Sequence, residues 1–207
     1  MLTLYEFALS GNCHKVRLLL SLLGVGYQSQ PVDAAARQHK AAEFLAMNPL
    51  GQVPVLCDGE HCLRDSQAIL YYLARRYDAG GQWLPDDALV QARIVGWLSL
   101  AAAEVSRGPA ALRLHHKWGR AIDTTDAEAA TQQVLTLLEA RLAEHDWLAD
   151  TRPTLADVAV QPYLALAGEG RVSLAAWPAT RRWLARMAAL PGYCAMPGMA
   201  DPATLAD

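Results

Sequence analysis

All strand-like segments of this 207-residue chain lie within its first 63 residues, and the sequence after residue 88 shows only helical periodicity. Apolar and polar residues alternate over 2–5, which indicates a strand, whereas Val16, Leu19 and Leu20 recur at helical spacing. Because the two patterns occupy separate parts of the chain, we expect an α/β unit followed by an all-helical unit.

The first unit has the predicted order βαβαββα. Its first helix stops at Gly24, and an extended segment at 27–32 completes a βαβ unit. A short helix at 41–47 precedes a strand-like segment at 53–56 that contains a proline. Since proline cannot donate to a sheet ladder, this segment needs an edge, a bulge or a special turn.

A hairpin and a helix complete the unit. Asp58 and Gly59 form a strong turn signal, so we expect a returning strand at 61–63 and then a helix at 66–76.

The chain changes character at 78–87, DAGGQWLPDD, which is rich in Gly, Pro and Asp and has no periodicity. We interpret this segment as a linker and expect two domains, residues 1–78 and 86–207. Thr154 and Asp157 have the spacing of a capping box, which we interpret as structural. The helices of the second domain are expected near residues 97–100, 134–142, 155–167 and 178–189, with an irregular tail after 191.

Composition and charge exclude several classes of protein. With 53% hydrophobic and 19% charged residues, the chain has the profile of a packed globular protein. A net charge of −3, without a block of Lys or Arg, makes nucleic acid a poor partner. We see no signal peptide and no apolar run of about 20 residues, so we expect a cytoplasmic protein without a membrane partner.

The four cysteines are Cys13, Cys57, Cys62 and Cys194. They form neither a C-x-x-C pair nor a zinc-ligand spacing, and they are too few for a disulfide scaffold. We therefore expect reduced thiols and no metal site.

Four local motifs follow one another along the chain: 10–17 (SGNCHKVR), 48–56 (NPLGQVPVL), 64–69 (RDSQAI) and 154–157 (TLAD). With the βαβαββα order and the helical second half, they make the whole chain resemble the cytosolic glutathione S-transferase family. The first motif looks like the first turn of theta-like and nu-like bacterial members. The others look like the stretch around the family's cis-proline, its glutamyl-binding turn and a helix start in its second domain.

The resemblance implies a thioredoxin-like N-terminal domain that binds glutathione and an all-α C-terminal domain that shapes the second-substrate site. It also implies a transferase that conjugates the glutathione thiolate to an electrophilic, largely apolar small molecule. Glutathione is then the co-substrate, and no metal is required. Members of the family are usually homodimers, with the helix after Ser66 packed on the partner's second domain, so Gln67 is expected near that interface.

The reaction needs glutathione as a thiolate, whereas a free thiol has a pKa of about 8.5. Ser10 matches the serine that activates glutathione in theta-like relatives, and Asn12 matches the asparagine that nu-like relatives use. A helix cap is the alternative role for both residues. Tyr5 is a competing hydroxyl but lies in the predicted strand, and Cys13 is expected to face the core.

The resemblance assigns the cysteinyl and γ-glutamyl units of glutathione to four residues. Val53 and Pro54 are expected to offer backbone groups to the cysteinyl unit, like a strand added to an edge, provided that the peptide before Pro54 is cis. Asp65 and Ser66 are expected to receive the γ-glutamyl end. A simple helix cap is again the alternative for this pair.

Gln52 and His39 fall where relatives contact the glycyl carboxylate, and Lys40 is a nearby cation that could help. A merely solvated side chain is the alternative for His39 and, more so, for Lys40. The basic and aromatic residues at 113–118 could line an acceptor pocket, but cations are also expected at a helix C-terminus. We favour the second interpretation for that cluster.

Two other functions stay open. A glutathione-dependent disulfide or peroxide reductase of the nu-like type is favoured if Asn12 matters more than Ser10. A non-catalytic binding module with the same fold is the other, although such a module has no need of the full set of glutathione-binding residues.

Overall fold

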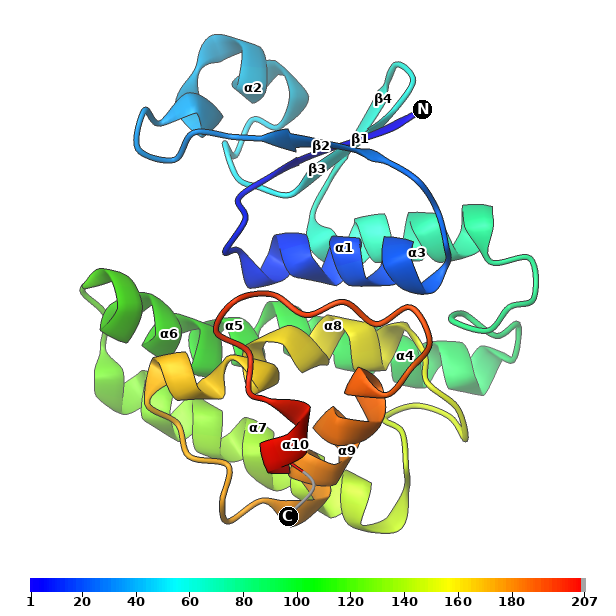
Figure 1. The fold of residues 1–207 in the computed structure, drawn as a ribbon, viewed down its shortest axis with the longest axis vertical. Coiled ribbons are helices and arrows are strands. Elements are labelled where there is room, and N and C mark those ends of the chain that lie inside the picture. The colour runs from blue at the N-terminus through cyan, green and yellow to red at the C-terminus, as the bar shows by residue number, and fades with distance from the viewer. Residues whose placement is uncertain (206–207) are drawn as a thin grey trace.

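The computed structural model describes residues 1–205 (Figure 1). In chain order, the strands are β1 (Leu2–Glu6), β2 (Gln28–Pro31), β3 (Val55–Asp58) and β4 (His61–Arg64). The helices are α1 (Gly11–Leu22), η1 (Gln38–Lys40), α2 (Ala42–Met47), α3 (Ser66–Tyr77), α4 (Ala88–Ala102), α5 (Glu104–Arg107), α6 (Pro109–Trp118), α7 (Thr124–Glu144), α8 (Leu155–Ala165), η2 (Ala167–Gly170), α9 (Pro178–Ala188) and α10 (Pro202–Leu205).

The N-terminal domain is built on a four-stranded sheet of order β2-β1-β3-β4. β1 runs parallel to β2 and antiparallel to β3, and β4 pairs antiparallel with β3. In Figure 1, α2 lies on one face of the sheet, and α1 and α3 lie on the other. The βαβαββα order is confirmed. The third strand begins at Val55, so Pro54 lies just before the strand and not within it.

Helix α1 is covered on two sides, by the sheet and by the helices of the C-terminal domain (Figure 1). Three consecutive residues, Leu18, Leu19 and Leu20, are therefore all fully buried. A helix with one exposed face would show the spacing of an amphipathic pattern instead. This packing places the first turn of α1 at the boundary between the two domains.

The C-terminal domain contains only helices among the described residues, as expected. Thr154 and Asp157 form the predicted capping box at the start of α8, and both are fully buried. The Asp157 carboxylate also accepts hydrogen bonds from Leu148 N–H at 3.1 Å and from the Trp183 indole at 2.9 Å. This residue is therefore a structural anchor, which confirms the interpretation from the sequence.

The expectation of four reduced cysteines is wrong. Cys57 and Cys62 form a disulfide between β3 and β4, whereas Cys13 and Cys194 are free. The two bonded residues lie directly opposite each other in the hairpin, with Cα atoms 4.0 Å apart, so their side chains share one face. A search for C-x-x-C spacing does not detect such a cross-strand pair.

The stretch Ala88–Trp118 is long and apolar enough to cross a membrane by composition alone, which the sequence did not lead us to expect. The structure divides this stretch into α4, α5 and α6, with breaks at Ala103 and Gly108, and only 22% of its most apolar window is buried. Such a stretch is weak evidence for a membrane span. Its exposed apolar surface becomes important below.

The tail after residue 191 folds back along α1 and α8 (Figure 1). Ser21 donates a hydrogen bond to the Gly192 carbonyl at 2.6 Å, and Ala200 N–H donates to the Ala165 carbonyl at 2.8 Å. The tail is mostly irregular, as expected, but ends in the short helix α10. It therefore ties the end of the chain to both domains.

Candidate active site

Ser10 is the N-cap of α1 and lies in the turn that follows β1. Its N–H donates to the Phe7 carbonyl at 3.1 Å, and its Oγ accepts a hydrogen bond from Cys13 N–H at 3.3 Å. Because Oγ acts as the acceptor in this cap, its own O–H stays available as a donor. The capping role and a role toward a ligand are therefore compatible.

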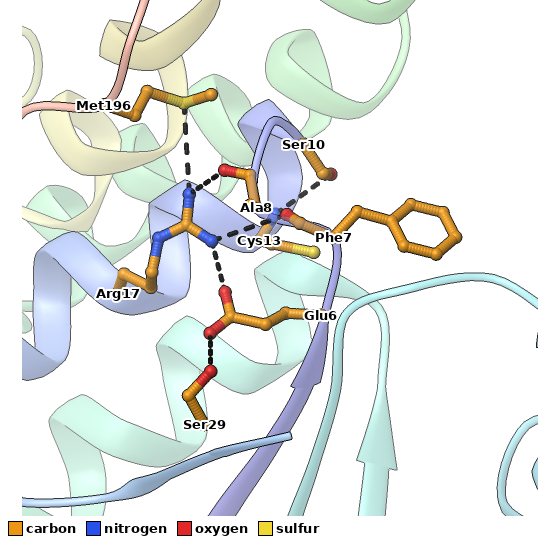
Figure 2. Close-up of polar contacts among 8 residues, drawn as sticks. All are labelled: Glu6, Phe7, Ala8, Ser10, Cys13, Arg17, Ser29 and Met196. Atoms are coloured by element: carbon orange, nitrogen blue, oxygen red, sulfur yellow. Dashed lines mark hydrogen bonds and ion pairs between the residues drawn. The ribbon is translucent and has the colours of Figure 1, made fainter. Parts of the chain in front are cut away.

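A network of polar contacts around Arg17 holds this turn in place (Figure 2). Arg17 donates to the Ala8 carbonyl at 2.9 Å and forms an ion pair with Glu6. Glu6 also accepts a hydrogen bond from Ser29 on β2 at 2.6 Å, and Met196 of the tail contacts the Arg17 guanidinium. Our sequence-based assignment missed Arg17; a charged Glu6 at the end of a buried strand was the signal that a partner was needed.

A polar cavity of about 650 Å³ opens in front of this turn. Seven of the eight predicted site residues line it: Ser10, Asn12, His39, Gln52, Val53, Asp65 and Ser66. The eighth, Pro54, lines a smaller adjoining cavity of about 80 Å³. Lys40 and Gln67 also line the larger cavity. The structure thus brings together residues from three distant motifs of the sequence.

The loop beside this cavity is fixed by its own polar contacts. The buried Asn48 side chain donates to the Gln52 carbonyl at 2.8 Å, and Lys40 donates to the Gly51 carbonyl at 2.7 Å. Gly51 has a φ of 57°, and a Cβ there would lie 2.6 Å from the His39 carbonyl oxygen, so only glycine fits. Lys40 therefore holds the loop. The peptide bond before Pro54 is cis, as expected.

Asp65 occupies an unusual backbone conformation at the other side of the cavity, with a φ of 73°. Its Oδ1 accepts hydrogen bonds from Gln67 N–H at 2.9 Å and from Ala68 N–H at 3.1 Å, so it caps α3. Its Oδ2 makes no hydrogen bond within the described residues, and Ser66 follows as the first residue of the helix. A carboxylate oxygen and a helix start therefore face the cavity together.

His39 lines the polar cavity, and its pKa lies below the ordinary value of an imidazole. Partial burial lowers its pKa from the ordinary value, and the neighbouring cations Lys40 and Arg37 lower it further. Its Nδ1 has no hydrogen-bond partner among the described residues, and its ring packs edge-on against Phe7 with 5.3 Å between the centroids.

A second, largely apolar cavity of about 440 Å³ adjoins the first. It is lined by Phe7, Ala8, Leu9, Ser10, Val32, Ala34, Ala110, Arg113, Leu114, Trp118 and Tyr163. Phe7, Ser10 and Leu114 line both cavities. Ser10 therefore stands where a polar space and an apolar space meet.

The basic and aromatic cluster of α6 does more than cap a helix end. Arg113 is only 3% exposed and lines the apolar cavity, and the Trp118 ring lies over its guanidinium with 4.8 Å from Cζ to the ring centroid. A helix end alone, the interpretation that we favoured from the sequence, does not describe these two residues, and their role toward an acceptor stays a prediction. Arg113 lies three residues after the buried Ala110, on the same helix face, which was the available signal.

Tyr163 of α8 closes the apolar cavity against α1. A Cβ on Gly11 would lie 2.7 Å from the Tyr163 ring, so glycine at this position allows the two helices to approach. Burial raises the pKa of Tyr163 to about 12, and the phenol stays neutral. The sequence motifs did not identify Tyr163, because it enters the site through contact between the domains.

Two family models match the chain: the glutathione S-transferase N-terminal domain over residues 1–75 and the glutathione S-transferase C-terminal domain over residues 107–191. Glutathione S-transferase 3 of Zea mays is 34% identical over 202 residues, covering 93% of this chain and 91% of that protein. Maleylacetoacetate isomerase of Pseudomonas aeruginosa is also 34% identical over 202 residues, covering 92% of each.

The fold agrees with the sequence comparison. A crystal structure of a glutathione S-transferase from Xanthobacter autotrophicus Py2 aligns with a TM-score of 0.88 and 33% identity, covering 96% of this chain and 98% of that one. Solved relatives with this fold include proteins with bound glutathione. The chain belongs to the glutathione S-transferase family.

Proposed function

We propose that this enzyme conjugates the thiolate of glutathione to an electrophilic, largely apolar small molecule. One observation carries the proposal: Ser10 lines both the polar cavity and the apolar cavity, and its hydroxyl hydrogen is not used by the helix cap. A glutathione thiolate that is bound in the polar cavity beside Ser10 would face an acceptor bound in the apolar cavity.

The role proposed for Ser10 is to donate a hydrogen bond that strengthens when the sulfur is charged. The positive end of α1 favours the same charge, and the amide of Asn12, which lines the polar cavity, is a second donor. Lowering a thiol pKa by about two units requires roughly 2.7 kcal/mol of preferential thiolate stabilisation. Two hydrogen bonds and a helix N-terminus supply energies of that order.

The proposed contacts of the tripeptide follow the wall of the polar cavity. The backbone of Val53 would pair with the cysteinyl unit, with Pro54 beside it. The free Oδ2 of Asp65 suits the α-amino group, and the helix start at Ser66 suits the α-carboxylate. The glycyl carboxylate is assigned to a separate pair, Gln52 and His39.

The test is a calorimetric titration with glutathione, with thiolate formation followed by ultraviolet absorbance, on the wild type, Ser10→Ala and Ser10→Thr. We expect the wild type to bind glutathione as a thiolate near neutral pH. Ser10→Ala should still bind it but raise the thiol pKa by about one to two units, and Ser10→Thr, which keeps cap and hydroxyl, should behave nearly as the wild type.

The outcomes separate the alternatives. If the wild type does not bind glutathione, the transferase proposal fails and the fold acts as a binding module. If Ser10→Ala still forms the thiolate, activation belongs to Asn12 or to backbone amides.

Product analysis then distinguishes three reactions. A thioether supports conjugation, whereas oxidised glutathione supports the reductase that a dominant Asn12 would favour. An isomerised acceptor with unchanged glutathione would match the reaction type that the name of the Pseudomonas aeruginosa relative indicates. We also propose a cytoplasmic location and a homodimer.

A further inference from the structure

Arg113 is the only charged side chain among the residues that line the apolar cavity. It is 3% exposed, although a buried charge is costly unless it is paired. Its presence beside Ser10 in an otherwise apolar wall therefore needs an explanation.

Two of the three guanidinium nitrogens of Arg113 have partners. Nε donates to the Glu169 carboxylate at 2.6 Å, and Nη1 donates to the Leu9 carbonyl at 2.8 Å. Nη2 is buried and has no hydrogen-bond partner within the described residues. A buried donor without a partner carries a free-energy penalty that a ligand acceptor would remove.

The charges around Arg113 do not balance. Glu169 is shared, because it forms an ion pair with Lys117 as well. Burial alone would raise the pKa of Glu169, but the hydrogen bonds from Lys117 and Arg113 outweigh that effect and hold the pKa below its ordinary value. Two cations thus share one ionised carboxylate, and the group keeps one net positive charge at the cavity wall.

The Trp118 ring covers the guanidinium and also lines the cavity. This ring is 48% exposed, so one side of it borders solvent and leaves it room to shift. An anionic group that enters the cavity could take the place of part of this cover and reach Nη2.

We propose that Arg113 recognises a carboxylate on the acceptor, so that the second substrate is an apolar electrophile that carries an acid group. This inference rests on the proposed transferase function and names the substrate class of the same site. The carboxylate would bind Nη2, the apolar body would lie along Leu114 and Tyr163, and the electrophilic carbon would face the thiolate at Ser10. The thiolate then forms the new carbon–sulfur bond as the acceptor's leaving group departs with its electron pair.

The test uses two electrophiles that differ only in charge, a chloronitrobenzoate and the matching chloronitrobenzamide, each of which loses chloride to the thiolate. Their ratio of kcat/KM is measured in the wild type, Arg113→Gln, Arg113→Lys and Lys117→Gln. Comparing the ratio between variants cancels the difference in intrinsic reactivity. Lys117→Gln separates the net charge of the cluster from the direct contact with Nη2, because Lys117 shares Glu169 with Arg113 but does not line the cavity.

We expect Arg113→Gln to lower the benzoate-to-benzamide ratio by about 10- to 100-fold, the range of one charge-assisted hydrogen bond. Arg113→Lys should retain part of the preference, and Lys117→Gln should lower the ratio less than Arg113→Gln does, because it removes the net charge of the cluster but leaves the Nη2 donor in place. The affinities of the two preformed glutathione conjugates, measured by calorimetry, should show the same ratios without any need for turnover.

An unchanged benzoate-to-benzamide ratio in Arg113→Gln would overturn the assignment. So would an equal fall in kcat/KM for both acceptors together with less glutathione thiolate, since Arg113 would then only position the turn through its hydrogen bond to Leu9. Both results leave the transferase proposal intact. Failure of the wild type to bind glutathione would instead overturn that proposal, and the acceptor assignment with it.

Discussion

The side chains of His14 and Lys15, two consecutive residues of α1, are buried without a hydrogen-bond partner in the described part of the chain. The atoms without a partner are both ring nitrogens of His14 and Nζ of Lys15. Lys15 Nζ lies 5.5 Å from the centroid of the Tyr163 ring. Burial lowers the pKa of His14 to about 3 and that of Lys15 to about 7. These residues are covered because α1 lies between the two domains.

His14 should make the protein sensitive to acid. Between the folded pKa of about 3 and the ordinary value of 6.5, the unfolded state binds a proton that the folded state does not. The free energy of unfolding therefore rises with pH across this window and is lost as pH falls, by about 1.4 kcal/mol per unit. Between pH 7.5 and pH 5, the free energy of unfolding of His14→Leu should therefore fall by about 2 kcal/mol less than that of the wild type.

Urea unfolding at several pH values measures this difference. The exposed His61 offers a control, since His61→Leu should leave the slope of the wild type unchanged. Equal pH slopes for His14→Leu and the wild type would show that His14 does not carry the effect.

The residues that the sequence could identify are those whose neighbours in the chain form a motif. Ser10, Pro54 and Asp65 each lie in such a motif, and the structure places them around adjoining cavities. Tyr163 escaped prediction, because only the contact between the domains brings it to Ser10, and Arg113 was considered for an acceptor pocket but assigned to a helix end.

At the scale of the element, the turn between β1 and α1 depends on Arg17. This side chain is 16% exposed and its partner Glu6 is 6% exposed, so the pair is largely withdrawn from water. The guanidinium also holds the Ala8 carbonyl, two residues before Ser10 (Figure 2). The pair thus has a structural role and a positioning role.

Arg17→Met should reveal both roles. It leaves the Glu6 carboxylate buried without its cation, which should destabilise the fold by roughly 3 kcal/mol, and it frees the turn, which should lower kcat for glutathione conjugation. The double variant Glu6→Gln with Arg17→Met removes the stranded charge. It should recover much of the stability in urea unfolding but not the activity. Recovery of both together would mean that Arg17 only stabilises the fold.

Element order could be predicted from periodicity, whereas the breaks between elements could not all be found. The chain from α4 to α6 reads as a long helical stretch, but it bends where Gly108 packs against α7, since a Cβ there would lie 2.8 Å from Thr131 N. Packing between distant segments decides such a break. The proposed domain limits of 1–78 and 86–207 stay a prediction.

At the scale of the whole molecule, α3 and α4 each carry large apolar side chains that are exposed. Tyr71 on α3 is 51% exposed, and Leu89 and Val95 on α4 are 60% and 57% exposed. These residues belong to the two helices that flank the linker, and α4 begins the apolar stretch whose most apolar window is only 22% buried. Exposed apolar side chains mark an interface where they form one contiguous patch. A second copy of this chain, packed α3 against α4, would cover both helices under one two-fold axis.

Leu89→Glu and Val95→Lys should therefore shift the protein from dimer to monomer in sedimentation velocity, because each places a charge in the apolar contact. Glutamate at position 89 lies in the first turn of α4, where the helix dipole favours a negative charge, so α4 itself should not be weakened. Leu137→Glu is the comparison: Leu137 is 47% exposed on α7, which the proposed contact of α3 with α4 does not include, and its replacement should leave the dimer intact. A wild type that sediments as a monomer would contradict the dimer, whereas dimeric Leu89→Glu and Val95→Lys would place its interface on another face.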